Sequence, residues 1–98
     1  MKRNELYLET PQGEFLLMPF RYGGGREGYM VQREGFKFNL TLEIPGVDED
    51  CMILKAWGAG KELVEHLMSK TDTFKKVGTI KVGVHEAIIV KLNPDFYE

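Results

Sequence analysis

The one cysteine and two histidines of this 98-residue chain, Cys51, His66 and His85, are its candidates for a thiol–imidazole pair or for metal ligands with sulfur and nitrogen. A cysteine beside a histidine forms the nucleophile–base pair of some enzymes, and metal sites usually take three or four ligands. No flanking signature accompanies Cys51, and a free cysteine is commonly a small buried hydrophobe. We therefore expect no enzyme, no metal and no cofactor, with a small cysteine-dependent enzyme as a remote alternative.

Two glycine-rich segments have the composition of phosphate-binding loops. Gly23-x-Gly25-x-x-Gly28 matches the dinucleotide fingerprint as a string, but a strand follows it where that fingerprint needs a helix. Gly58-Ala59-Gly60-Lys61 precedes a helix, but Glu62 stands where a Walker loop has serine or threonine. We interpret the first segment as a hairpin loop and the second as a strand-to-helix turn.

Charged and aromatic side chains in the loops are the candidates for contact with a partner. Arginine and tyrosine are favoured at interfaces, and an acidic loop speeds association with a basic partner. The candidate contact residues are Arg21, Tyr22, Arg26, Tyr29, Asp48, Glu49, Asp50 and Trp57. An alternative set for nucleic acid is Arg21, Arg26, Lys75, Lys76 and Lys81, and it predicts binding that falls steeply with salt.

Composition restricts the class of protein. Fifteen acidic and thirteen basic residues give a net charge of −2, so neither whole-surface mimicry of DNA nor phosphate binding driven by an excess of positive charge is expected. The nucleic-acid alternative requires a basic face in spite of this net charge. A single cysteine excludes an internal disulfide, and no apolar run approaches the ~18 residues of a membrane span. We expect one domain over residues 1–98, cytoplasmic, without membrane contact, as a monomer or homodimer.

Hydrophobic periodicity predicts the elements that position these residues. Residues 36–44 alternate over their whole length, which predicts one long strand with Phe36 and Phe38 on its core face. Residues 61–70 are the one expected helix, with Leu63, Val64, Leu67 and Met68 on one stripe. Other strands are expected at 5–10, 15–18, 29–32, 51–57, 77–82 and 86–92. The order βββββαββ predicts an α+β fold, a curved and mainly antiparallel sheet of about six to seven strands packed on one helix.

The order of short motifs from Phe20 to Leu92 adds a family resemblance. The motifs are Arg21-Tyr22-Gly23-Gly24-Gly25-Arg26, Leu40-Thr41-Leu42-Glu43-Ile44-Pro45-Gly46, Ile53-Leu54-Lys55, the helix with Glu62-Leu63, and the hairpin from Val77-Gly78-Thr79 to Val84. This order resembles a family of small uncharacterised proteins carried on conjugative elements, plasmids and phages of Gram-positive bacteria. The chain departs from the family pattern at Glu43, where the family has asparagine, and at residues 56–60, where it has an acidic or amide-rich turn.

The resemblance implies an accessory factor of a mobile genetic element. Together with the missing catalytic set, it leads us to expect a non-catalytic protein that binds a host or element-encoded protein by steric occlusion. An inhibitor of a host-defence nuclease, an anti-CRISPR candidate, is the most specific form of this hypothesis. A nucleic-acid-binding module that uses Arg21, Arg26 and the Lys75, Lys76 and Lys81 strand is the alternative.

Overall fold

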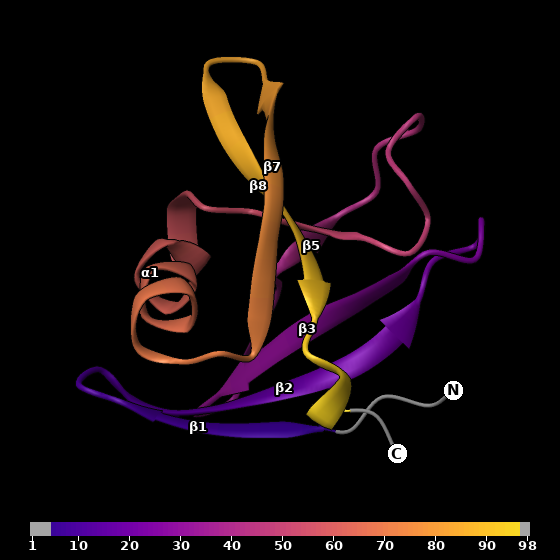
Figure 1. Ribbon diagram of the computed structural model, residues 1–98. Helices are drawn as coiled ribbons and strands as arrows, with labels where there is room; N and C mark the ends of the chain where they lie inside the picture. The colour runs from indigo at the N-terminus through magenta and orange to yellow at the C-terminus, as the bar shows by residue number, and fades with distance from the viewer. Residues whose placement is uncertain (1–4, 97–98) are drawn as a thin grey trace.

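The computed structural model describes residues 5–96 of the chain, which form eight strands, one α-helix and two short 3-10 helices (Figure 1). The elements are β1 (Leu6–Thr10), β2 (Gly13–Arg21), β3 (Glu27–Arg33), β4 (Phe36–Asn39), β5 (Thr41–Leu42), β6 (Met52–Leu54), η1 (Gly58–Gly60), α1 (Lys61–Lys70), β7 (Phe74–Val82), β8 (His85–Leu92) and η2 (Pro94–Phe96). The predicted helix has the observed bounds, and one more strand precedes it than the sequence pattern indicated.

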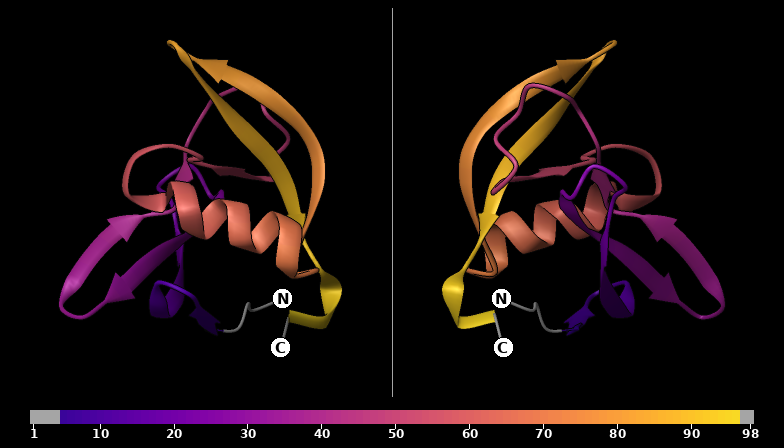
Figure 2. Two further views of the ribbon diagram at one scale, coloured as in Figure 1. Left: turned by 90° about the vertical axis from the view of Figure 1, so that its left-hand side faces the viewer. Right: turned by 90° about the vertical axis from the view of Figure 1, so that its right-hand side faces the viewer.

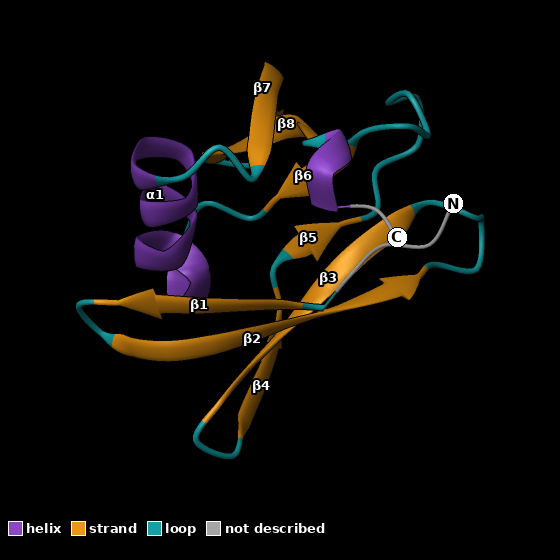
Figure 3. Cartoon of the chain, turned by 60° about the horizontal axis from the view of Figure 1, so that its bottom comes forward, coloured by secondary structure: helices purple, strands orange, loops and turns teal. Residues whose placement is uncertain are grey.

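The strands form two antiparallel sheets of four strands each. The first sheet has the order β1-β2-β3-β4, and the second has the order β5-β6-β8-β7. Figure 3 shows the first sheet in front of the second sheet and α1. The predicted α+β class and antiparallel pairing are confirmed, whereas the single sheet of six to seven strands is corrected to two sheets.

Leu40 connects the two sheets and accounts for the extra strand. Its backbone N–H donates to the carbonyl of Tyr29 in β3 at 3.0 Å, and its own carbonyl accepts from Lys55 N, just after β6, at 2.8 Å. Its side chain is fully buried. The predicted strand over 36–44 is therefore divided here into β4 and β5, because the backbone leaves one sheet and enters the other.

One buried apolar cluster joins both sheets and the helix. It contains Leu6, Phe15, Leu17, Tyr29, Val31, Leu40, Met52, Leu54, Leu63, Val64, Leu67, Phe74, Val90 and Leu92. The helix contributes the predicted stripe, with Leu63, Val64 and Leu67 buried and Met68 partly buried against the cluster. Figure 2 shows α1 lying across the molecule between the β3–β4 hairpin and the β7–β8 hairpin. Its buried residues belong to the same cluster as residues of both sheets.

Phe36 was predicted in the core and is instead 75% exposed. It follows the two-residue turn of Glu34 and Gly35, whose φ angles of 47° and 89° suit a tight hairpin. The core does not extend under this turn, so only Phe38 on the same side of β4 packs partly against the cluster. The strand predicted at 51–57 is also shorter, since β6 ends at Leu54.

Gly28 lets three segments approach one another beside the start of β3. A Cβ on Gly28 would overlap Thr41 Oγ1 and lie 2.8 Å from Tyr22 Cε2. The hydroxyls of Tyr22 and Thr41 are 3.0 Å apart, and Tyr29 N donates to Thr41 Oγ1 at 3.3 Å. The end of β2, the start of β3 and the edge strand β5 are thereby held together.

Candidate functional site

Arg26 is a buried cation that organises an exposed loop. It stands one residue before β3, and only 3% of its surface is exposed. Its Nε donates to Glu43 Oε1 at 2.8 Å. Its other N–H groups donate to four backbone carbonyls of the loop, those of Ile44 (3.3 Å), Val47 (2.6 Å), Asp48 (2.7 Å) and Cys51 (2.9 Å). These five hydrogen bonds match the five N–H donors of a guanidinium.

The loop formed by residues 43–51, here called the acidic loop, is also held by its own turn. Asp48 Oδ1 accepts from Asp50 N at 2.9 Å, and the Asp48 carbonyl accepts from Cys51 N at 3.0 Å. The side chains of Asp48, Glu49 and Asp50 are exposed. Figure 2 shows the loop on the side of the β7–β8 hairpin that faces away from α1. Three carboxylates are therefore presented to solvent on a backbone that an internal cation fixes.

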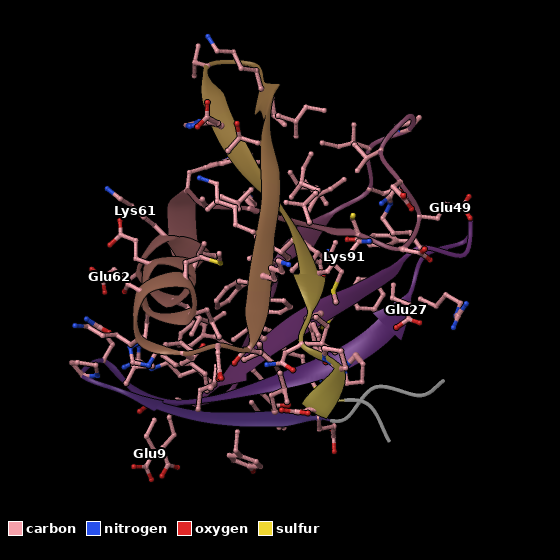
Figure 4. The ribbon with its side chains drawn as sticks, viewed as in Figure 1. Glu9, Glu27, Glu49, Lys61, Glu62 and Lys91 are labelled. Atoms are coloured by element: carbon pink, nitrogen blue, oxygen red, sulfur yellow. The ribbon has the colours of Figure 1, made fainter. Side chains whose placement is uncertain are left out.

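A polar hollow of about 380 Å³ opens beside the acidic loop, between the ends of the two sheets. Arg21 and Glu27 line it and form an ion pair at 3.3 Å, in which the arginine side chain is 64% exposed. Glu49 and Asp50 line it from the loop, and Lys91 from β8. Figure 4 shows Glu27, Glu49 and Lys91 on one side of the molecule. The lining mixes both charges and suits a polar protein surface better than an apolar small molecule.

The structure therefore brings Arg21, Glu49 and Asp50 together around the hollow, and Asp48 is exposed on the same loop, so these four residues form one candidate surface. Two other candidate contacts are corrected. Arg26 is bonded internally throughout its guanidinium, and Tyr29 is fully buried with its ring edge-on to Phe74 at 6.1 Å between centroids. Neither side chain is accessible to a partner. Tyr22 is half-buried, its ring 4.7 Å from that of Phe20 and its hydroxyl on Thr41.

Trp57 belongs to a different part of the surface. Its ring stacks on that of His85 with 4.6 Å between centroids and 6° between planes, and Lys55 Nζ lies 6.0 Å from its centroid. Trp57 and Lys55 line a groove of about 300 Å³ with Phe38 and Asn39, and this groove shares no lining residue with the polar hollow. Trp57 is therefore a candidate contact of a second surface.

The lysines of the nucleic-acid alternative lie on β7, an edge strand of the second sheet. Lys75, Lys76 and Lys81 are all exposed. Lys75 is the cross-strand neighbour of Lys91, and Lys81 is the neighbour of Glu86. Lys75 and Lys91 therefore form a pair of like charges at one end of the β7–β8 hairpin, and Lys76 points to the other face of the sheet. The charge of Lys81 is balanced by its neighbour Glu86. Arg26 does not join this group, because its guanidinium is buried.

Cys51 and the histidines have separate surroundings. Cys51 is 3% exposed, as expected for a free cysteine that acts as a small buried hydrophobe. Its backbone carbonyl accepts a hydrogen bond from Arg26. His85 stacks on Trp57, and His66 is half-buried on α1. Within residues 5–96, no three side chains of His, Cys, Asp or Glu gather as metal ligands.

Two residues of the site were missed by the sequence reasoning. Glu43 is the carboxylate partner of Arg26 across 17 positions of the chain, and no local pattern in the sequence indicates that pairing. Lys91 reaches the polar hollow from the far end of β8. It carries no local signal, because an exposed lysine near a strand end is common on any sheet.

Comparisons with known proteins identified no relative of this chain. No family model, no curated protein and no solved structure matches this chain. No helix within residues 5–96 has the length and apolar character needed to span a membrane.

Proposed function

We propose that this protein is a non-catalytic binding module that acts in the cytoplasm by occupying the surface of another protein, with the acidic loop as its contact element. The observation that carries the proposal is the burial of Arg26, all of whose donors hold that loop. A loop fixed before binding loses little conformational entropy on association, so more of its contact energy contributes to affinity.

The exposed side chains of the loop define the chemistry of the partner. Asp48, Glu49 and Asp50 present three negative charges, and Arg21 beside them is already paired with Glu27. The complementary surface is a basic groove on another protein. Proteins that hold a nucleic acid have such grooves. This supports the more specific proposal of an accessory factor of a mobile genetic element that blocks a host-defence nuclease, such as a CRISPR effector.

The test is capture of a partner by the wild type and by two matched variants. The loop variant, Glu49→Lys with Asp50→Lys, reverses two loop charges and leaves the Asp48 turn intact. The control, Glu62→Lys with Glu65→Lys, makes the same change of net charge on the exposed face of α1. Each protein is immobilised and exposed to a nuclease-treated lysate of a Gram-positive host near physiological ionic strength.

A basic protein retained in stoichiometric amount by the wild type and the control, and lost from the loop variant, supports the proposal. The purified partner should then lose its nucleic-acid binding when this protein is added. Equal retention by all three proteins contradicts the role of the acidic loop. Continued nucleic-acid binding in the complex contradicts occlusion.

One observation favours nucleic acid as the second candidate partner. Lys75 and Lys91 face each other across strands, and like charges directly opposite one another destabilise a sheet. Lys91 also lines the polar hollow with acidic residues, so Lys75 is the cation that a bound phosphate would compensate most. This candidate predicts capture that disappears with nuclease treatment. It also predicts that the variant Lys75→Glu with Lys76→Glu loses that capture, while the loop variant keeps it.

A further inference from the structure

The first sheet has an apolar outer face that takes no part in the core. Along β2 the residues Phe15 and Leu17 point inward, so Leu16 and Met18 point outward. The register places outward residues of the neighbouring strands beside them, since Leu16 pairs with Tyr7 and Met18 pairs with Met30. The apolar residues of this outer face are Tyr7, Leu16, Met18, Phe20 and Met30, and none of them belongs to the buried cluster.

Within residues 5–96, α1 and most of the second sheet lie on the opposite side of this sheet. The outer face is covered at its Phe20 end, where Tyr22 and Thr41 of β5 pack beside Gly28. Figures 1 and 3 show α1 and the strands of the second sheet on the inner side of β1–β4. Tyr7 remains 76% exposed, while the four other apolar residues are half-buried by one another and their neighbours. Contiguous exposed apolar residues with a polar rim are typical of a protein-binding surface.

The charges at the rim of this outer face have opposite signs at its two edges. Glu9 and Glu14 are cross-strand neighbours on β1 and β2, and both are exposed. Lys37 is exposed on β4, in the row of Tyr7, Leu16 and Gln32. Figure 4 shows Glu9 pointing away from the rest of the molecule. Four strands span about 14 Å between the outermost strand axes, so the acidic edge and the basic edge lie well apart.

This pattern is complementary to itself. A two-fold axis that runs parallel to the strands, between two outer faces in contact, places β1 of each copy over β4 of the other. Lys37 of each copy then lies over Tyr7 of the other copy, close to Glu9 and Glu14. A hollow of about 440 Å³ opens at that place and has room for the lysine side chain. It is lined by two carboxylates and one cation among less polar groups: Tyr7, Glu14, Phe15, Leu16, Gln32, Arg33 and Glu34. The Arg33 guanidinium is already bonded to the Gln12 carbonyl and lies over the Phe15 ring. Aligned face-to-face packing is the usual arrangement of two sheets.

We infer that the outer face of the β1–β4 sheet binds a second copy of this chain in an isologous dimer, with Lys37 of each copy between Glu9 and Glu14 of the other. The apolar residues at the centre of the face supply the buried surface, and the two charge clusters set the orientation. The acidic loop is not part of this face, so the inference does not depend on the proposed function. Because four of its five apolar residues are already half-buried in the single chain, we expect a weak dimer, with a dissociation constant of about 1 to 100 μM.

Sedimentation velocity over that range of concentration tests the dimer. The wild type should shift from monomer to dimer. The variant Lys37→Glu and the variant Glu9→Lys with Glu14→Lys should each raise the dissociation constant at least tenfold, roughly the effect of facing like charges. An equimolar mixture of these two variants should dimerise again, because both charge clusters of the mixed dimer are then complementary. Met30→Lys at the centre of the face should remain monomeric.

Matched controls separate this interface from a general effect of charge. Lys81→Glu on β7 and Glu62→Lys with Glu65→Lys on α1 change the net charge equally and should dimerise as the wild type does. Circular dichroism spectra that superpose show that each variant is folded. A wild type that is monomeric throughout overturns the inference. So does a dimer that Lys37→Glu leaves unchanged, or a mixture of the two charge variants that stays monomeric.

Discussion

The rings of Trp57 and His85 stack with 4.6 Å between centroids and 6° between planes. Trp57 immediately precedes η1 and α1, whereas His85 is the first residue of β8 after the hairpin turn. The stack therefore links the outer end of the β7–β8 hairpin to the segment that leads into the helix. Val84, the residue before His85, is 96% exposed, so the hairpin turn itself has little other packing.

Replacing His85 by alanine should uncover one face of Trp57. The emission maximum of Trp57, the single tryptophan of the chain, should shift to longer wavelength as water reaches the indole. The free energy of unfolding should fall by about 0.5 kcal/mol, the low end for an aromatic pair, because His85 is exposed. Val84→Ala is the control and should leave the emission unchanged. An unchanged emission maximum in His85→Ala would contradict the stack.

Alanine at Gly28 should destabilise the protein strongly. Its methyl group would overlap Thr41 Oγ1 and press on Tyr22 and Phe20, whose nearest atoms are 2.8 Å and 3.1 Å from the position of that Cβ. We expect a loss of about 1 to 3 kcal/mol in urea unfolding, as for overpacked sites. Gly24→Ala is the matched control, since nothing lies within 4 Å of its Cβ and its φ is ordinary. Equal stability of the two variants would refute the close approach.

A mild replacement of Arg26 should increase the motion of the acidic loop while the rest of the protein stays folded, and a more drastic one should also lower the stability of the whole protein. Lysine has three donors and cannot reach five acceptors, so Arg26→Lys should increase amide hydrogen exchange across residues 44–51 while β2 and β3 stay protected. Arg26→Met should lower the free energy of unfolding by about 3 kcal/mol, the low end for breaking a buried ion pair, because Glu43 keeps contact with water.

Arg21→Met is the comparison for these variants. Its ion pair with Glu27 is exposed, so its loss should change the stability by less than about 1 kcal/mol. If Arg21→Met and Arg26→Met are equally stable, or if the exchange of residues 44–51 is unchanged in Arg26→Lys, Arg26 does not organise the loop.

The parts of the fold that depend on local pattern were predicted from the sequence. The helix over 61–70 follows from the 3.6-residue spacing of Leu63, Val64 and Leu67, and the glycines before it supply the turn. The division of the strand over 36–44 was not predictable in this way. Residues before and after Leu40 keep the same alternation, and only the pairing of Leu40 with Tyr29 on one side and Lys55 on the other divides them between sheets.

In the candidate site, too, contacts between residues far apart in the sequence could not be predicted from residue type. Residue type alone made Arg21, Asp48, Glu49 and Asp50 candidate contacts, because charged residues in turns are solvated in most folds. Residue type also made Arg26 a candidate contact, although its guanidinium is enclosed by a loop that begins 17 positions later. Burial of an arginine depends on carbonyl groups, which every residue carries, so the side-chain sequence contains no sign of it.

Alkylation of Cys51 tests both the burial of the thiol and the stabilisation of the acidic loop by Arg26. The thiol is 3% exposed, and the Cys51 carbonyl accepts a hydrogen bond from Arg26 Nη1 at 2.9 Å. Iodoacetamide should therefore react with the native protein about 100-fold more slowly than with the urea-unfolded chain, which corresponds to an opening free energy of about 3 kcal/mol. Arg26→Lys should speed the native reaction by roughly tenfold, since one of the bonds that close the loop is weakened. Arg21→Met should leave it unchanged. Rapid alkylation of the wild type near neutral pH would instead indicate a reactive thiolate, and it would favour the cysteine-dependent enzyme over the binding module.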